Sequence, residues 1–190
     1  MANVNLTEVA ENILKIARKH DCAAQVTMVE TDSKDIHLRK GETEHLLTSI
    51  AISTGVRLFK GEKSAIISFS GEDFADMEGK IKDTLENLQY LGEDRYKRLL
   101  TAAEFGGRAK SLDLNDDHFD DIDTHRVVEA LNCIETHALA FSNKITPSDM
   151  AEFSGSRTNV HLFTSEGLNK SYGKSFYTFS YTAVAEENGL

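Results

Sequence analysis

The sequence has few cysteines, one proline, no tryptophan and no long apolar run. Cys22 and Cys133 are its only cysteines, and they stand far apart and outside any CxxC spacing. This spacing excludes a disulfide framework and a zinc ribbon, and it predicts reduced, small, partly buried thiols. No window approaches the roughly 20 apolar residues of a membrane-spanning helix. Residues 1–5 lead directly into an amphipathic stretch without the apolar core of a secretion signal, which predicts a cytoplasmic protein with no membrane partner.

Positive charge is also scarce. Lysine and arginine together number 21 against 31 aspartates and glutamates, so the formal net charge is −10. Binding to nucleic-acid phosphates needs clustered basic side chains, so we expect no nucleic-acid partner. With 40% apolar and 27% charged residues, the composition is typical of a globular chain that can bury about 70% of its unfolded surface.

The common helical motif of metallopeptidases is missing. In that motif two histidines one turn apart, with a glutamate between them, hold zinc. Neither HExxH nor HExxxH occurs in residues 1–190. Ser154, Ser156 and Ser165 have no histidine and aspartate arranged recognisably around them, and we interpret them as turn or edge residues. The sequence therefore assigns no catalytic, cofactor-binding or metal-binding residue.

Apolar residues at three- and four-residue spacing predict helices over Leu6–His20, Phe74–Leu88 and Val127–Phe141. Glu72 and Asp73 would lie in the first turn of the second helix, where carboxylates suit the helix dipole. A shorter helical stretch is predicted over Arg95–Phe105. After Gly106-Gly107, the acidic segment 108–123 is typical of a solvated connection or a helix start.

Short β-rich runs lie between the first two helices. They are Gln25–Glu30, Asp35–Arg39, Glu44–Ser53, Val56–Phe59 and Ala65–Phe69. The breaks between them have turn-forming compositions: Thr31-Asp32-Ser33, Lys40-Gly41-Glu42, Thr54-Gly55 and Lys60-Gly61-Glu62-Lys63. Links this short favour antiparallel neighbours, so we expect a meander.

A hairpin is predicted near the end of the sequence, with arms Asn159–Thr164 and Lys174–Ala185. Gly167 and Gly173 would serve at a turn or bulge, and Pro147 would separate the third helix from the hairpin. The fold class is α+β, a mainly antiparallel sheet covered by helices and followed by a C-terminal β-hairpin. We expect an α+β domain over residues 1–143, and a hairpin segment over 144–190 that continues it or leads into a further domain.

Glu129, Cys133 and His137 recur every four residues, so one helix face could present three metal ligands. The alternative, which we favour, is a boundary face with a buried thiol. The aspartates from 113 to 123 suggest calcium, but an EF-hand loop starting at Asp113 would have His118 and Thr124 where it needs Gly and Glu. His118 and His125 could titrate near neutral pH, with acidic neighbours raising the pKa of each.

Aromatic side chains crowd the second arm of the hairpin. They could line a peptide groove, let an extended substrate add to a sheet edge, form a core cluster or make a subunit contact. We favour the last two interpretations. The residues are Tyr172, Phe176, Tyr177, Phe179 and Tyr181.

The later part of the sequence carries a family resemblance. Its motifs are Lys144-Ile145-Thr146, Phe153-Ser154-Gly155-Ser156-Arg157, Ser165-Glu166-Gly167-Leu168, Ser171-Tyr172 and Ala185-Glu186-Glu187-Asn188-Gly189. In this order they resemble the end of the amino-terminal domain of the TldD/PmbA family, also named peptidase U62 and modulator of DNA gyrase, and most closely its PmbA (TldE) branch. Lys40-Gly41-Glu42-Thr43-Glu44 and Gly55-Val56-Arg57-Leu58-Phe59 are similar to earlier parts of the family pattern. Gly92-Glu93-Asp94-Arg95-Tyr96 lacks the proline that family members commonly have there.

The resemblance implies a non-catalytic domain of a candidate zinc metalloprotease that acts on peptides or unfolded proteins, such as a microcin precursor or an antitoxin. Zinc is expected in a carboxy-terminal part or in a TldD-type partner, with no cofactor in this chain. The implied assembly is a homodimer or a heteromer with a TldD-type subunit. The alternative is a binding or scaffold subunit without a metal site. Because residues 185–190 follow a predicted strand directly, we expect the natural protein to be longer.

Overall fold

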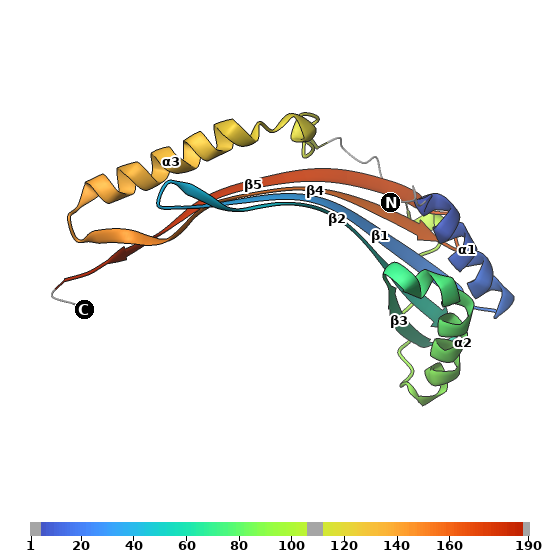
Figure 1. The fold of residues 1–190 in the computed structure, drawn as a ribbon. Helices are drawn as coiled ribbons and strands as arrows, with labels where there is room; N and C mark the ends of the chain where they lie inside the picture. Colours follow the sequence, from blue (N-terminus) through green and yellow to red (C-terminus); the bar gives the residue numbers. More distant parts are fainter. Residues whose placement is uncertain (1–4, 106–111, 188–190) are drawn as a thin grey trace. The chain divides into compact units, whose positions relative to one another are not determined.

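The computed structural model describes residues 5–105 and 112–187, without the side chains of residues 71–73 and 147–149. Strands are the most abundant secondary structure in the described chain (Figure 1). The main elements are α1 (Leu6–Lys19), β1 (Ala23–Arg39), β2 (Glu42–Lys60), β3 (Lys63–Phe69), α2 (Met77–Asn87), α3 (Thr124–Phe141), β4 (Ile145–Thr164) and β5 (Asn169–Ala185).

The described residues form a five-stranded sheet with the strand order β3-β2-β1-β4-β5. β2 pairs antiparallel with β3, with Thr54 opposite Phe69 and Lys60 opposite Lys63. β4 is antiparallel to β1. Ala24 near the start of β1 hydrogen-bonds to Ser165 just after β4, whereas Asp35 later in β1 hydrogen-bonds to Ser154 earlier in β4. The predicted α+β class, an antiparallel sheet with helices and a C-terminal hairpin, is therefore confirmed.

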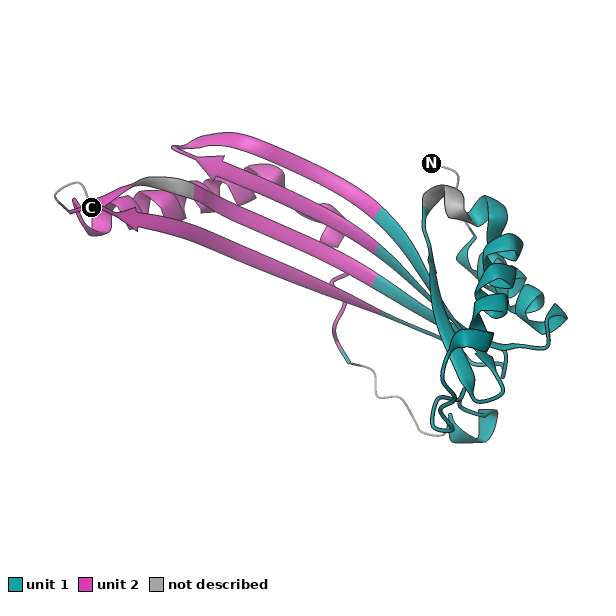
Figure 2. Ribbon diagram, turned by 90° about the horizontal axis from the view of Figure 1, so that it is seen from below, with its two compact units in different colours: residues 1–30, 51–112, 159–172 teal, residues 31–50, 113–158, 173–190 magenta. Residues whose placement is uncertain are grey.

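The chain divides into two compact units (Figure 2). Unit 1 comprises residues 1–30, 51–112 and 159–172, and unit 2 comprises residues 31–50, 113–158 and 173–190. β1, β2, β4 and β5 each contribute residues to both units. No helix in the described ranges is long and apolar enough to cross a membrane.

Unit 1 is built around α1, which confirms the first predicted helix. Asn5 caps α1 by accepting a hydrogen bond from the Glu8 backbone N–H, and the helix packs its apolar stripe against the sheet. α2 packs on the same core. The buried core residues include Ile13 and Ala17 of α1, Val26 and Met28 of β1, Val56 and Leu58 of β2, Phe69 of β3, Ile81 of α2 and Phe163 of β4.

Unit 2 is built around α3, which confirms the third predicted helix. Asp123 caps α3 by accepting from the His125 N–H, so the end of the acidic segment is a helix start. Val127 and Leu131 of α3 pack on a second core with Ile36, Leu38, Ala151 and Phe153. The buried Glu135 carboxylate accepts hydrogen bonds from the backbone N–H groups of Lys40 and Gly41, at 2.9 and 2.7 Å. The β1–β2 turn is thereby fastened to the helix.

Two predicted strand breaks are wrong. β1 continues through Thr31-Asp32-Ser33, because Thr31 and Asp32 meet Thr158 and Arg157 of β4 across the sheet. β2 continues through Thr54-Gly55, which pairs with Phe69 and Ser68 of β3. The predicted turns at Gly41 and Gly61 are confirmed, and both glycines adopt the positive φ that favours glycine, at 76° and 61°.

The helical predictions around β3 need correction. The second helix begins at Met77 instead of Phe74, because residues Gly71–Asp76 form a 3-10 turn and Asp76 caps α2. The helix predicted over Arg95–Phe105 is wrong, since only Ala102–Glu104 forms a single 3-10 turn. Gly106-Gly107 and the following residues to 111 lie outside the described residues.

The predicted hairpin exists with longer arms, β4 and β5. Gly167 occupies its turn with a φ of 88°, as predicted. Gly173 lies inside β5 instead of at a turn. Pro147 lies near the start of β4, so the separation between helix and hairpin falls earlier, at residues 142–144.

Candidate functional site

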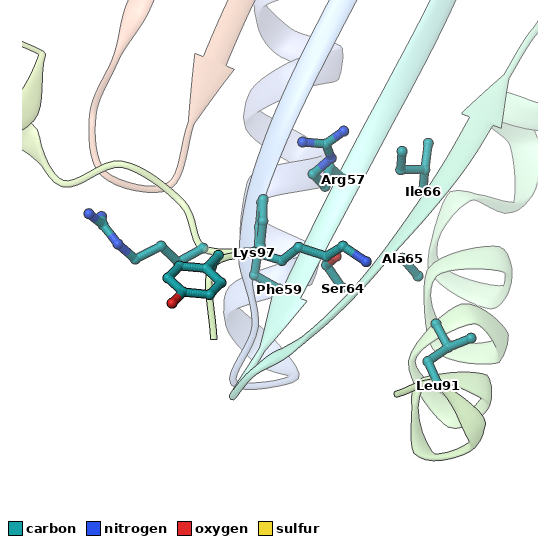
Figure 3. Close-up of a pocket in the computed structure, with 9 residues that line it drawn as sticks. Arg57, Phe59, Ser64, Ala65, Ile66, Leu91 and Lys97 are labelled. Atoms are coloured by element: carbon teal, nitrogen blue, oxygen red, sulfur yellow. The ribbon is translucent and has the colours of Figure 1, made fainter. Parts of the chain in front are cut away.

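A cavity of about 540 Å³ lies on the β2–β3 hairpin of unit 1 (Figure 3). Arg57 and Phe59 alternate along β2 with the buried Val56 and Leu58, so they project from the face opposite the helical core. Residues of the segment after α2 line another side of the cavity. Its lining residues are Arg57, Phe59, Ser64, Ala65, Ile66, Leu91, Tyr96, Lys97 and Arg98.

The segment after α2 that lines the cavity is held by polar contacts. The Asp94 N–H donates a hydrogen bond of 2.8 Å to the Glu62 carbonyl oxygen at the β2–β3 turn. Arg98 donates two hydrogen bonds to Glu104, at 2.7 and 2.6 Å, and Glu104 also accepts from the backbone and hydroxyl of Thr101. The Arg98 guanidinium, followed by the Thr101 hydrogen bonds, lowers the pKa of Glu104 to about 2.

Positive charge is concentrated in this cavity although the whole chain is strongly acidic. Three basic side chains line it, and none of its described lining residues is acidic. Arg98 is engaged by Glu104, and the Lys97 ammonium lies 3.6 Å from Asp94. Within the described part of the chain, Arg57 makes no hydrogen bond or ion pair. The cavity therefore offers a free guanidinium beside apolar surface.

Unit 2 contains a half-buried arginine that joins three segments of the chain. Arg157 of β4 donates to Asp32 of β1, with a shortest distance of 2.6 Å, and to Asp120 of the acidic segment, with a shortest distance of 2.8 Å. Its guanidinium also stacks over the buried Phe119 ring, 4.9 Å from the centroid. Because Arg157 binds it, the pKa of Asp120 is lowered. Part of the predicted solvated linker is thus attached to the sheet.

The same acidic segment contacts β5. The Tyr177 hydroxyl donates a 2.7 Å hydrogen bond to Asp116, and burial together with this bond raises the pKa of Tyr177 to about 12. The Tyr177 ring stacks with Phe119 and Phe153, and Phe179 lies 5.0 Å from Phe153. These contacts join the two rings to the buried Phe119 and Phe153, in line with the predicted cross-strand cluster, while Tyr177 and Phe179 are themselves 36% and 47% exposed. Tyr172 in unit 1 and Phe176 in unit 2 are exposed.

A polar patch covers the face of unit 2 that is opposite to α3. The Ser154 hydroxyl donates a 2.6 Å hydrogen bond to Asp35, and His37 Nε2 lies 3.7 Å from the Glu152 carboxylate. Glu152 and Ser154 also line a small cavity of about 200 Å³ with Thr178 and Ser180. These groups pair across strands, so the patch contributes to strand register as well as offering hydroxyl groups at its surface.

Two family models match the sequence. One describes PmbA/TldA metallopeptidase domain 1 and matches residues 24–88, and the other describes the PmbA/TldA metallopeptidase central domain and matches residues 117–190. The chain belongs to the PmbA/TldD metallopeptidase family. No curated protein has a matching sequence.

Solved structures of similar fold include members of the same family. A candidate modulator of DNA gyrase from Thermotoga maritima has 12% identity and a TM-score of 0.77, with 97% of this chain and 41% of that chain covered. A candidate modulator of DNA gyrase from Bacteroides thetaiotaomicron has 19% identity and a TM-score of 0.79, with 93% and 40% covered. TldE from Thermococcus kodakarensis has 12% identity and a TM-score of 0.72, with 96% and 40% covered. The chain spans about 40% of the length of these proteins.

The described residues do not fit the metal that a metallopeptidase family implies. No group of three His, Cys, Asp or Glu side chains in ranges 5–105 and 112–187 could hold a metal ion. Cys133 Sγ and His137 Nδ1 come within 3.5 Å, but His137 also contacts the Cys133 carbonyl oxygen, and Glu129 pairs with His125 instead. The three-ligand interpretation of α3 is therefore wrong. The favoured alternative, a boundary face of α3 with a buried thiol, is wrong about the thiol. Cys133 is exposed, whereas Cys22 is buried.

The remaining predicted candidates take structural positions. His118 hydrogen-bonds Asp121 at 3.0 Å, and this bond raises the pKa of His118, as predicted. The Ser165 hydroxyl accepts from the Ala24 N–H at the β4–β5 turn, as expected of a turn residue. Ser154 lies within β4 and pairs with Asp35.

Sequence reasoning missed Arg57, Glu135 and Arg157. A carboxylate on the apolar side of a helix is a usable signal for Glu135, since such a group needs a buried donor. Arg157 lies in the Phe-Ser-Gly-Ser-Arg motif that carried the family resemblance, but its partners lie 125 and 37 residues away. Arg57 lies in the Gly55-Val56-Arg57-Leu58-Phe59 motif, but nothing in the sequence indicated a site there, because the cavity forms only with residues 91–98 of the later segment.

Proposed function

We propose that this part of the family protein is a non-catalytic domain of a zinc metalloprotease system that acts on peptides or unfolded proteins. The proposal is supported by the different roles of the polar side chains in the two units. Those resembling catalytic groups hold strands and turns together, whereas the cavity on the β2–β3 hairpin presents an unengaged cation beside apolar side chains. Such a surface suits recognition of a chain segment more than bond cleavage.

In this proposal zinc would be held by another part of the longer protein or by a TldD-type partner. The present residues would supply a binding surface and contacts within a homodimer or a heteromer. The protein would act in the cytoplasm and would bind no nucleic acid, since the net charge of −10 opposes contacts with phosphates. The second candidate is a scaffold subunit of the same system, which the exposed apolar side chains of β2 and β5 would favour.

The test is cleavage of casein and of an unfolded peptide by this chain, by a TldD-type protein, and by their mixture. We expect no cleavage by the chain alone, and a change in the cleavage rate of the TldD-type protein when the chain is added. Stoichiometric metal together with cleavage by the chain alone would contradict the proposal. Peptide binding by the chain favours the recognition role, whereas a changed rate without peptide binding favours the scaffold.

A further inference from the structure

We propose that the cavity on the β2–β3 hairpin binds an acidic side chain of a peptide, with its carboxylate on Arg57 and a neighbouring apolar residue on the hairpin surface. This inference rests on the proposed function, which it deepens by naming the chemical class of peptide. The site is assembled from two strands and one connecting segment, all within unit 1.

The strand register places charge and apolar surface side by side. Arg57 is directly opposite Ile66 and Phe59 directly opposite Ser64, and residues directly opposite each other share one face of the sheet. The guanidinium therefore projects next to the Ile66 side chain, which is 64% exposed. Leu91 adds further exposed apolar surface from the connecting segment. In Figure 3 the Lys97 side chain reaches across this face of the hairpin.

The existing partners of the three basic side chains indicate that Arg57 is the one that binds the peptide carboxylate. Glu104 already takes two hydrogen bonds from Arg98, and Asp94 lies near Lys97. Arg57 has no hydrogen-bonding or ionic partner within the described ranges, although its planar fork matches a carboxylate with two parallel bonds. Lys97 adds a second positive charge without a fixed geometry. Charge complementarity thus selects a carboxylate.

The volume sets the size of the ligand segment. About 540 Å³ falls within the range of pockets that enclose small organic groups, and it exceeds what one carboxylate requires. A glutamate followed or preceded by leucine would place the acid on Arg57 and the aliphatic group against Ile66 and Leu91. The buried Phe59 forms part of the wall between them.

The test measures binding of short fluorescent peptides to the whole chain by anisotropy. Each peptide is acetylated and amidated at its ends, and has a leucine beside either a glutamate or a glutamine at its centre. We expect the glutamate peptide to bind at least about tenfold more tightly than the glutamine peptide, the size expected for hydrogen bonds to a charged group. Arg57→Gln should remove this preference.

Arg126→Gln is the matched control, because it changes the net charge equally and Arg126 is 85% exposed on α3, outside the cavity. It should leave both affinities within about twofold, as expected for an exposed charge. Equal affinity for the two peptides, an unchanged preference in a folded Arg57→Gln variant, or tighter binding of a DNA duplex would overturn the inference. The peptide pair decides the matter on the parent chain even if the variant fails to fold. Because no cleavage is measured, the inference can fail while the proposed function stands.

Discussion

Glu135 provides the most direct test of how unit 2 is held together. Its carboxylate is only 4% exposed and accepts one backbone N–H on each oxygen, from Lys40 at 2.9 Å and from Gly41 at 2.7 Å. A hydrogen bond to a charged group contributes about 1.5–3 kcal/mol to stability. Two such bonds give about 3–6 kcal/mol. Lys40 and Gly41 lie in an exposed turn, where water can replace part of the loss, so Glu135→Ala should destabilise the protein by about 2–4 kcal/mol.

The matched control is Glu129→Ala, which makes the same change on the same helix. Glu129 has a 66% exposed side chain, and its one ion pair among the described residues is with His125, at 3.5 Å, so its loss should cost less than about 0.5 kcal/mol. Unfolding in urea, followed by circular dichroism, measures both. Amide hydrogen exchange adds a local measurement, because a chain of two units need not unfold in one step.

The expected pattern is faster exchange of the Lys40 and Gly41 amides in Glu135→Ala, with unchanged exchange in Glu129→Ala. Glu135→Gln keeps one acceptor oxygen and should fall between the parent and Glu135→Ala. Equal urea midpoints for Glu135→Ala and the parent, together with unchanged exchange at the β1–β2 turn, would show that the Glu135 hydrogen bonds do not stabilise unit 2.

Three further predictions concern Thr54, Cys22 and Tyr177. The Thr54 hydroxyl is buried without a partner among the described residues, so Thr54→Val should stabilise the folded protein against urea by about 1 kcal/mol, and a lower urea midpoint would contradict this. Burial raises the pKa of the Cys22 thiol, so a thiol reagent should label the exposed Cys133 in the native protein and Cys22 only after unfolding; equal labelling rates would be inconsistent with the fold. Burial, with the hydrogen bond to Asp116, raises the pKa of Tyr177 to about 12, whereas an unfolded tyrosine titrates near about 10. The unfolded chain therefore loses this proton first, and stability should fall between about pH 10 and about pH 12. In Tyr177→Phe the urea midpoint should fall less over this pH range than in the parent protein. An equal fall in both proteins would show that Tyr177 does not cause it.

α1 and α3 could be predicted from the sequence because the residues that define each helix lie close together in the chain. The stripes of α1 and α3 recur every three or four residues, and the caps Asn5 and Asp123 precede them directly. The turns at Gly41 and Gly61 were equally local, since a positive φ favours glycine. These features fixed the α+β class and the antiparallel pairing of neighbouring strands.

The lengths of the strands could not be read in the same way. Thr31-Asp32-Ser33 has a turn-forming composition, yet the partners of Thr31 and Asp32 on β4 lie more than a hundred residues later. The sheet ladder therefore overrides a weak local preference. The helix predicted over Arg95–Phe105 failed for a related reason, because contacts with the β2–β3 turn hold Asp94 while Glu104 pairs with Arg98.

The candidate site shows the same limit more strongly. Arg57 is an ordinary alternating strand residue in sequence, and becomes a candidate anchor only when residues 91–98 fold over the hairpin. Conversely, the regular spacing of Glu129, Cys133 and His137 suggested a metal site. In the structure Glu129 pairs with His125 and His137 contacts the Cys133 carbonyl oxygen, so the three groups do not converge. Spacing along a helix brings residues to one face and does not by itself converge their ligand atoms.

The most direct test of the central claim is zinc retention by this chain. The protein is equilibrated with excess zinc, separated from free metal by gel filtration, and analysed for bound metal beside a Cys133→Ser variant. We expect far less than one zinc per chain in both samples, since the described residues bring no three ligands together. One tightly held zinc per chain that is lost in the Cys133→Ser variant would contradict it.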